Sequence, residues 1–220
     1  MTRYLAERGV ESRFVNGLRV TTPEVLDAVL KVFAGSVNQE LVGAFTAAGA
    51  SAVGLTGMDG LITEAEPWSE ELGHVGKPVR SDPRLLDLLL ENGHLPVVAC
   101  LAGDRQGRFY NVNADRMAAS VAAAIHADKL FFLTDVEGVR GQDNLIYPTI
   151  NAQECGDLIR NQVATGGMQA KLDAAIEALS SGVRDVTIAP GAVPGIIGKL
   201  LSGQKIGTRL LAFETRAVRQ

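Results

Sequence analysis

The chain has 220 residues, of which 46% are hydrophobic and 21% charged, and its formal net charge is −4. This length allows one large domain or two small ones with a substantial core, and the absence of any Lys/Arg run argues against a nucleic-acid partner. No apolar stretch reaches the roughly 20 residues that span a bilayer, and the N-terminus lacks the apolar core of a signal peptide, so we expect a cytoplasmic, enzyme-like protein without a membrane partner.

The first clear helix signals lie near residue 22. Thr22 is a residue type that caps helices, and Pro23 suits the first helical position, so a helix is predicted to begin there. Apolar residues at helical spacing continue to Gly35, where we expect this helix to end. Asn38 is then a possible cap for a second amphipathic helix over residues 38–50.

The remaining elements follow from the same patterns of apolar spacing and of Gly and Pro breaks. Helices are predicted over 2–9, 82–93, 113–127, within 151–167, over 168–182 and over 193–203. Strands are predicted within 12–22 and over 51–57, 95–103, 129–135, 184–190 and 207–213, with hairpins or irregular structure over 58–80.

Strands and helices therefore alternate through most of the chain, and the strands are continuous apolar runs. Such runs are typical of strands that helices cover on both faces. We therefore predict a three-layer α/β/α sandwich with a mainly parallel central sheet. Its active site should lie beyond the carboxyl ends of the strands, where Thr134-Asp135 and the Gly-rich loop after 51–55 are found.

Lys171 is the first candidate for chemistry. Gly166 and Gly167 come just before the predicted helix that carries it, so free backbone N–H groups and the positive end of the helix dipole are expected there. A lysine near this end is disfavoured by the dipole unless an anion lies in front of it, and phosphate is the commonest such anion. The alternative is a solvated surface lysine.

The stretch "NVNAD" (111–115) is the second candidate. Asn113 can cap the helix that follows it, and Asp115 suits the first turn of that helix. Capping does not require Asn111, whose amide can donate and accept and so suits an amide or carboxylate ligand. Asp115 could instead hold a lysine ammonium in place, with Lys171 as the candidate.

Arg19, after a glycine turn, is the third candidate. Its guanidinium can hold a carboxylate in a bidentate pair, whereas the alternative is an ion pair with a neighbouring Glu on the surface. Cys100 and Cys155 have neither metal spacing nor a disulfide framework, and Cys100 is expected to be a small core residue. The histidines show no metal or triad pattern, so no metal site formed by the protein is predicted.

Several of these segments, taken together, resemble the amino acid kinase family, and within it the N-acetylglutamate kinases of arginine biosynthesis. The matching pieces occur in family order across nearly the whole chain: "FVNGLRVT" (14–21), "VGLTGMDG" (53–60), "ELGHVG" (71–76), "LLENGHLPVV" (89–98), "NVNAD" (111–115), "LTDVEGV" (133–139), "TGGMQAKLDAA" (165–175) and "GTRLL" (207–211). The resemblance implies the same α/β/α fold and a homodimer or larger homo-oligomer.

The resemblance also implies a reaction, the transfer of a phosphoryl group from ATP to the side-chain carboxylate of N-acetyl-L-glutamate. Arg19 would bind the α-carboxylate of this substrate, and Asn111 would bind the substrate as well. Lys171 would neutralise the charge that develops on the transferred group, and Asp115 would organise the catalytic lysines.

By the same likeness, Thr134, Asp135, Gly166 and Gly167 would lie along the nucleotide, which would carry Mg²⁺. Residues 1–125 would form the lobe for the amino-acid substrate, and residues 126–220 the nucleotide-binding lobe of a single kinase domain.

The chain departs from the family pattern at its start. The family opens with a strand and a Lys-x-Gly-Gly turn, followed by a Gly-Gly-Gly loop, and neither motif is present here. We therefore expect an N-terminally truncated domain that lacks about 60–80 residues and one of two catalytic lysines, with little or no kinase activity for residues 1–220 alone.

Two other functions stay open at this point. One is a sister kinase that acts on a carrier-bound aminoadipate or glutamate, because few contacts decide between such substrates. The other is a non-catalytic subunit that binds acylamino acids, although the presence of Lys171 and Asp115 argues against it.

Overall fold

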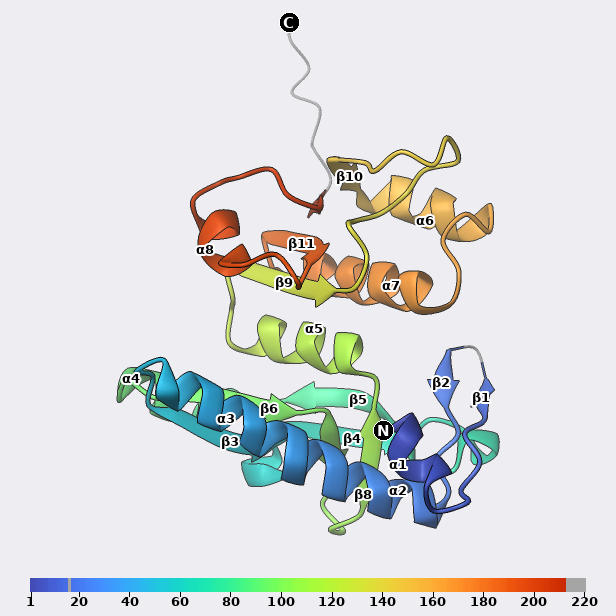
Figure 1. The fold of residues 1–220 in the computed structure, drawn as a ribbon, viewed down its shortest axis with the longest axis vertical. Coiled ribbons are helices and arrows are strands. Elements are labelled where there is room, and N and C mark those ends of the chain that lie inside the picture. Colours follow the sequence, from blue (N-terminus) through green and yellow to red (C-terminus); the bar gives the residue numbers. More distant parts are fainter. Residues whose placement is uncertain (16, 213–220) are drawn as a thin grey trace, which may run out of the picture. The chain divides into compact units, whose positions relative to one another are not determined.

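The computed structural model describes residues 1–15 and 17–212, which form alternating helices and strands (Figure 1). The chain divides into two compact units, Met1–Ile125 and His126–Gln220. Each unit is described by itself below.

The first unit contains five α-helices, a π-helical segment and eight strands in the described residues. The helices are α1 (Thr2–Ala6), α2 (Pro23–Val29), α3 (Asn38–Ala47), α4 (Arg84–Glu91) and α5 (Ala114–Ala124), and the π-helical segment η1 (Leu30–Val37) joins α2 to α3. The strands are β1 (Phe14–Val15), β2 (Leu18–Arg19), β3 (Ala52–Thr56), β4 (Thr63–Pro67), β5 (Val75–Ser81), β6 (Leu95–Ala99), β7 (Leu101–Gly103) and β8 (Phe109–Val112). Short 3₁₀ turns, η2 (Asp59–Leu61) and η3 (Glu70–Leu72), lie before β4 and β5.

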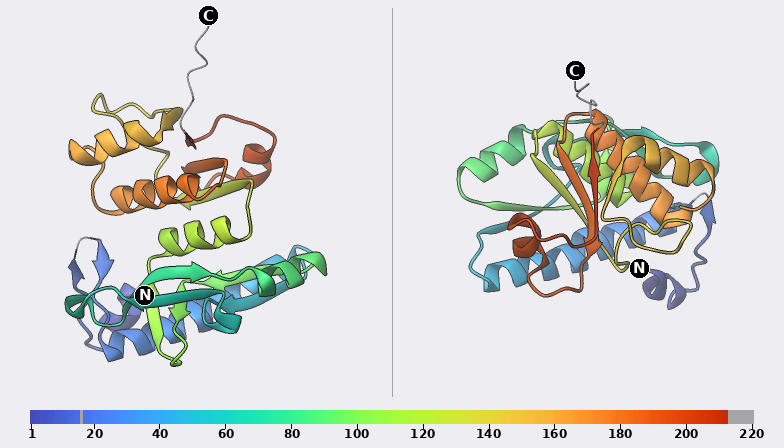
Figure 2. Two further views of the ribbon diagram at one scale, coloured as in Figure 1. Left: turned by 180° about the vertical axis from the view of Figure 1, so that it is seen from behind. Right: turned by 90° about the horizontal axis from the view of Figure 1, so that it is seen from above.

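The strands of this unit form a hairpin, a parallel pair and a small barrel. β1 and β2 are antiparallel, β3 and β6 are parallel, and β4, β5, β8 and β7 close into the barrel. Helix α5 covers one side of these strands, and α2 and α3 lie along the other (Figures 1 and 2). The unit is therefore a sandwich of helices around strands.

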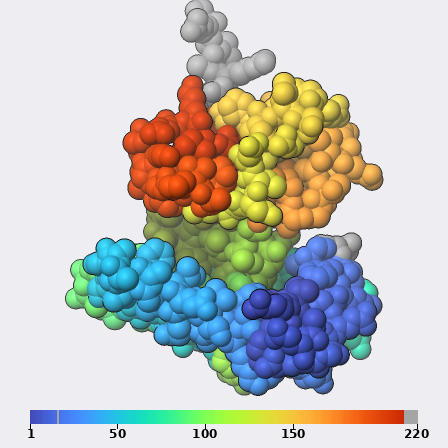
Figure 3. All heavy atoms as spheres, in the orientation of Figure 1, coloured from blue at the N-terminus to red at the C-terminus, as the bar shows by residue number. Residues whose placement is uncertain are grey.

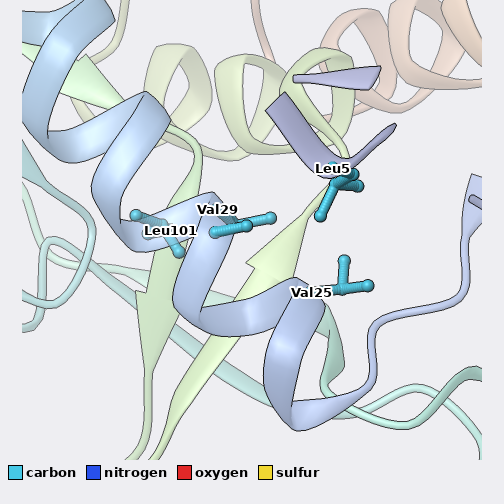
Figure 4. Packing of buried hydrophobic residues seen from close by; sticks show 5 residues of the cluster. Leu5, Val25, Val29 and Leu101 are labelled. Atoms are coloured by element: carbon cyan, nitrogen blue, oxygen red, sulfur yellow. The ribbon is translucent and has the colours of Figure 1, made fainter. Parts of the chain in front are cut away.

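Two buried clusters hold the layers together. Met117 of α5 packs against Ala65 and Tyr110 of the barrel. On the opposite side, Leu5, Val25, Val29 and Leu101 bring α1, α2 and β7 into contact (Figure 4). Because all four of these side chains are at most 1% exposed, they contribute the full hydrophobic free energy of burial, about 1.5–3 kcal/mol for each side chain.

The helix that begins at Pro23 was predicted to end at Gly35, and this is wrong. The chain stays helical from α2 through η1 into α3, and Gly35 lies inside it. Asn38 is not a cap either, because its backbone is helical and its side chain is buried. Its amide instead donates to Leu55 O (3.4 Å) and Val97 O (2.7 Å), which fastens the helix to β3 and β6.

Other boundaries agree with the sequence. The Thr22 hydroxyl accepts a hydrogen bond from the Val25 N–H at 3.3 Å, with Pro23 in the first turn, as predicted.

The apolar run over 95–103 was predicted to be one strand, but it divides at Cys100 into β6 and β7. The division is needed because β6 pairs with β3 whereas β7 pairs with the barrel strands β4 and β8.

The second unit contains a four-stranded sheet between helices. Its elements are β9 (Lys129–Thr134), β10 (Thr149–Asn151), α6 (Ala152–Arg160), α7 (Gly166–Ser180), β11 (Asp185–Pro190), α8 (Ile196–Leu201) and β12 (Thr208–Leu211). The strand order is β10-β12-β11-β9, in which β9 runs parallel to β11 and β10 parallel to β12, while β11 and β12 are antiparallel.

Both faces of this sheet are covered. Helices α6 and α7 lie on one face and α8 on the other (Figure 2), and every residue of β11 from Asp185 to Ala189 is buried. The predicted α/β class is thus confirmed, with parallel pairs and flanking helices in each unit. Of the predicted closing strand over 207–213, Phe213 lies outside the described residues.

Candidate functional site

Arg19 ends strand β2, and the structure holds its guanidinium with neutral partners. Its nitrogens donate to the hydroxyls of Ser12 (2.5 Å) and Thr2 (3.2 Å), and the group lies 4.5 Å from the centre of the Phe14 ring. Among the described residues, the contacts of Arg19 include no carboxylate, which argues against the surface ion pair considered above. Partial burial lowers the pKa of the Arg19 guanidinium, which still stays charged at any physiological pH.

Asn111 lies in β8, and a buried threonine links it to Arg19. The Asn111 amide nitrogen donates to the Thr21 hydroxyl at 3.0 Å, and this hydroxyl donates to the carbonyl of Arg19 at 2.9 Å. Residues far apart in the sequence thus belong to one hydrogen-bonded network within the first unit. This role of Thr21 was not predicted, although Thr21 is part of the motif "FVNGLRVT".

The start of α5 follows the prediction. Asn113 caps the helix by accepting a hydrogen bond from the Arg116 N–H at 3.1 Å, and Asp115 lies in the first turn. Asn113 and Asp115, which follow Asn111 in the motif, are therefore placed by the end of β8 and by this cap. Asp115 is half-buried and carries its negative charge where the helix dipole favours it.

Lys171 lies in the second unit, on α7. This helix begins at Gly166, so both glycines are in its first turn rather than before it, and Lys171 is in the second turn. The unfavourable effect of the dipole on Lys171 is therefore smaller than predicted, because it falls off within the first turn. The side chain of a helical residue points toward the N-terminus, so Lys171 can still reach toward that end.

The N-terminus of α7 suits an anion for two reasons. Thr165 precedes it in extended conformation without a side-chain cap, and the first N–H groups of a helix have no intrahelical acceptor. Gly166 and Gly167 are exposed, and a Cβ added to either would meet no atom within 4 Å. Gly166 has a φ of +55°, which favours glycine, so an approach to the backbone is open at this point.

Thr134 and Asp135 lie at the carboxyl end of β9, as predicted. The Thr134 carbonyl accepts a hydrogen bond from the Gly191 N–H at 2.8 Å, and Pro190 of β11 is its register partner. The Thr134 hydroxyl donates to the Asp135 carboxylate at 3.1 Å. Two parallel strands therefore end side by side here, the position where α/β sheets bind ligands.

The loop after β9 is anchored by Thr208, a residue that the sequence analysis did not single out. The buried Thr208 hydroxyl accepts from the Val139 N–H at 2.8 Å and donates to the Tyr147 carbonyl at 2.6 Å. Gly138 passes close to Thr208, where a Cβ would stand 2.8 Å from its hydroxyl oxygen. Gly138 and Val139 belong to the motif "LTDVEGV" and Thr208 to the motif "GTRLL", so this contact joins two of the segments that resemble the family.

Cys100 and Cys155 have structural rather than catalytic surroundings. Cys100 packs against the cluster of Ala65 and Met117, and burial raises the pKa of its thiol. Burial also raises the pKa of the Cys155 thiol to about 12. Thiols with raised pKa values are weak nucleophiles, so neither is a candidate for catalysis.

A comparison with protein families places the chain. The model of the amino acid kinase family matches residues 1–190. The chain belongs to the amino acid kinase family.

Within this family the similarity is to acetylglutamate kinases. The chain is 57% identical over 211 residues to the acetylglutamate kinase of Solibacter usitatus. The matched region covers 96% of this chain and 82% of that protein. It is 43% identical over 215 residues to the acetylglutamate kinase of Acidobacterium capsulatum, which covers 96% of this chain and 83% of that protein.

Solved structures show the same fold. The crystal structure of smu.665 from Streptococcus mutans has a TM-score of 0.83 at 27% identity and covers 96% of this chain and 81% of that one. N-acetylglutamate synthase from Neisseria gonorrhoeae, complexed with coenzyme A and N-acetyl-glutamate, also has a TM-score of 0.83 at 27% identity, over 95% of this chain and 49% of that one.

Two further features are absent from the part of the chain that the structure describes, a metal-binding cluster and a membrane-spanning helix. No group of three or more His, Cys, Asp or Glu side chains in residues 1–15 and 17–212 could hold a metal ion. None of the helices described here is both long enough and apolar enough to cross a bilayer.

Proposed function

We propose that this protein transfers the γ-phosphoryl group of ATP to the side-chain carboxylate of N-acetyl-L-glutamate, giving N-acetylglutamyl 5-phosphate for arginine biosynthesis. The observation that carries the proposal is the 57% identity to an acetylglutamate kinase over 96% of the chain. In this reaction a carboxylate oxygen attacks the γ-phosphorus, the bond from phosphorus to the β,γ-bridging oxygen breaks, and ADP leaves.

The first unit supplies the site for N-acetyl-L-glutamate in this proposal. Arg19 offers a partly buried guanidinium whose described contacts are neutral, so its charge is available to the α-carboxylate of the substrate. Asn111 belongs to the same hydrogen-bonded network and offers an amide for the rest of the substrate.

The second unit supplies the nucleotide site. The uncapped N-terminus of α7, with Gly166 and Gly167, would receive phosphate oxygens, while Thr134 and Asp135 would lie along the nucleotide at the end of β9. Mg²⁺ would arrive bound to the phosphates of ATP, since oxygen ligands from phosphates and water are the ones that it usually keeps.

Lys171 and Asp115 would act on the reacting groups. A transferred phosphoryl group gains negative charge on its equatorial oxygens, and an ammonium placed beside them lowers the barrier. Lys171 would provide this charge, and Asp115 would orient the lysine ammonium. Neither residue forms a bond to the substrate, because the reaction needs positioning and charge rather than covalent catalysis.

The protein would act in the cytoplasm as a homodimer or larger homo-oligomer. Val37, Leu41 and Phe45 recur every fourth residue along η1 and α3 and are 39%, 45% and 41% exposed. Helix α3 lies open on the surface of the first unit (Figure 3). An apolar stripe of this kind is a surface that a second subunit could cover.

The test is a phosphoryl-transfer assay with Lys171→Met and a matched control. We expect only slow N-acetylglutamate-dependent ADP release from residues 1–220, because these residues contain neither the Lys-x-Gly-Gly turn nor the Gly-Gly-Gly loop. The acyl phosphate is trapped by hydroxylamine as a hydroxamate, so that slow turnover accumulates a measurable product. Lys171→Met should lower kcat by about 100-fold or more, because it removes charge stabilisation in the transition state. Lys199→Met, which removes a lysine from α8 in the same unit, should leave kcat unchanged.

Calorimetry with each substrate separates the other possibilities. Binding of N-acetylglutamate and ATP without turnover in any variant would support a non-catalytic binding subunit instead. Turnover of a carrier-bound aminoadipate or glutamate, with none of N-acetylglutamate, would support the sister kinase. Equal kcat values for the Lys171→Met variant and the unmodified chain would contradict the role of Lys171.

A further inference from the structure

Thr21 lies between the two residues assigned to the substrate. Its side chain is 0% exposed, and its hydroxyl makes two hydrogen bonds, one with the Arg19 carbonyl at 2.9 Å and one with the Asn111 amide at 3.0 Å. The proposed phosphoryl transfer assigns no role to the Thr21 hydroxyl. A buried hydroxyl with two polar partners on different strands suggests a role in placing one of them.

The single proton of the hydroxyl decides how the Asn111 amide is turned. A hydroxyl has one donor, and Thr21 uses it on the Arg19 carbonyl, which can only accept. Toward Asn111 it can therefore offer only a lone pair, so the NH₂ end of the amide must face it. The amide oxygen of Asn111 is thereby fixed on the side away from Thr21.

The backbone around Thr21 holds this hydroxyl in place. The Thr21 N–H donates to Leu72 O at 3.0 Å, and the Thr21 carbonyl accepts from His74 N at 2.8 Å. The next bond continues the series, because Asn111 N donates to His74 O at 2.9 Å. Residues 72–74 thus lie between Thr21 and β8 as a bound strand-like segment.

Gly73 makes this close approach possible. It has a φ of +64°, and a Cβ at this position would stand 2.5 Å from the Thr21 carbonyl oxygen. Any other residue would be strained in conformation and would push Thr21 away. The position of the Thr21 hydroxyl is therefore determined from three segments of the chain.

We propose that Thr21 is the positioning residue of the N-acetylglutamate site. It fixes the direction of the Asn111 amide and ties it to the backbone of Arg19, so that both groups meet the substrate in one arrangement. The inference rests on the proposed function, since it assumes that Arg19 and Asn111 bind N-acetylglutamate. Without the hydroxyl, the amide would be free to rotate, and part of the binding free energy would be spent on ordering it.

The test compares Thr21→Val, which keeps the shape and removes the hydroxyl, with Thr21→Ser, which keeps the hydroxyl. Calorimetry on the whole chain should show the Kd of N-acetylglutamate about tenfold higher for Thr21→Val and within about twofold for Thr21→Ser. The Kd of ATP should not change in either. Thr63→Val is the matched control, because Thr63 is also 0% exposed in the same unit and its hydroxyl lies 3.0 Å from the Ser81 hydroxyl; its Kd for N-acetylglutamate should stay unchanged.

The outcomes separate this inference from the function on which it rests. If the unmodified chain does not bind N-acetylglutamate, the proposed function is wrong. If the unmodified chain binds and Thr21→Val binds equally well, or Thr21→Ser binds as weakly as Thr21→Val, the positioning role of the hydroxyl is wrong. If circular dichroism shows that Thr21→Val does not fold, Thr21→Cys is used in its place. This variant should also raise the Kd of N-acetylglutamate, because a thiol is a weak donor and acceptor.

Discussion

At the scale of single residues, neighbouring cations can offset the cost of burying a carboxylate. Asp185 is an example outside the candidate site. Its carboxylate is 9% exposed and lies 2.9 Å from Lys129 Nζ and 2.9 Å from Arg209 Nη2, on the strands on either side of it. Burial acts to raise the pKa of Asp185, but the hydrogen bonds from Arg209 and Lys129 outweigh it and hold the pKa below its usual value.

The lowered pKa of Asp185 makes stability depend on pH in a definite direction. A depressed folded-state pKa adds stability above the unfolded value, about 3.9, and this stability is lost as the pH falls through the folded value. We expect Asp185→Asn to destabilise the protein by about 1–3 kcal/mol at neutral pH, and the difference should shrink below about pH 4. Urea unfolding at a series of pH values measures both effects.

Asp128→Asn is the control for this prediction. Asp128 precedes Lys129, and its side chain is 83% exposed, with Arg184 3.9 Å away. An exposed ion pair of this kind adds little, so the unfolding midpoint should hardly move at any pH. A pH-independent loss in Asp185→Asn would show that the amide disturbs packing rather than removing a charge pair.

Residue types that act locally could be predicted from the sequence, whereas residues that act across the chain could not. The caps Thr22 and Asn113 were predicted because their partners lie three residues away. Thr21 was missed because its partner Asn111 is 90 positions further along. The roles of Arg19, Asn111, Asp115 and Lys171 came from the family resemblance and remain to be tested.

At the scale of elements, Asn38 shows how a buried polar side chain joins a helix to a sheet. Its amide donates to carbonyls of both β3 and β6, and it passes over Gly54, where a Cβ would overlap the Asn38 side-chain oxygen. The sequence suggested a cap at Asn38 and a helix end at Gly35, because Asn and Gly are commonest at such boundaries. The tertiary contact overrides these local preferences.

Alanine substitutions at Gly54, which faces Asn38, and at Gly43, which does not, should have opposite effects on the free energy of unfolding. Gly54→Ala should destabilise the protein by about 1–3 kcal/mol, because Asn38 must move. Gly43→Ala, in the exposed part of α3 where a Cβ meets no atom within 4 Å, should instead stabilise it by about 0.5–1 kcal/mol. Thermal or urea unfolding of both variants checks the signs.

A double-mutant cycle tests the cause. In an Asn38→Ala background the space above Gly54 is larger, so Gly54→Ala should cost less than it does beside Asn38. Additive losses would mean that something other than the Asn38 side chain penalises a Cβ at Gly54.

At the scale of the whole molecule, the chain forms two units that divide after Ile125. We propose that the first is the lobe for the amino-acid substrate and the second the nucleotide-binding lobe. The first contains Arg19 and Asn111 in one network, whereas the second contains the open N-terminus of α7 and the strand end at Thr134.

Hydrogen exchange can test whether each unit binds the ligand assigned to it. ATP should slow amide exchange mainly in residues 126–212, and N-acetylglutamate mainly in residues 1–125, because a ligand protects the amides that it orders or covers. Mass spectrometry of peptic fragments resolves the two regions. Protection by N-acetylglutamate confined to the second unit would contradict the assignment.

The π-helical segment Leu30–Val37 has a consequence for sequence change in this chain. A turn closed from residue i to i+5 holds one residue more than an α-helical turn, so loss of one residue there would rotate everything after it by about 100°. The Asn38 amide would then face solvent instead of the carbonyls of β3 and β6. The length of this helix therefore decides which face of α3 meets the strands, and we expect relatives to differ between α2 and α3 by substitutions rather than by insertions or deletions.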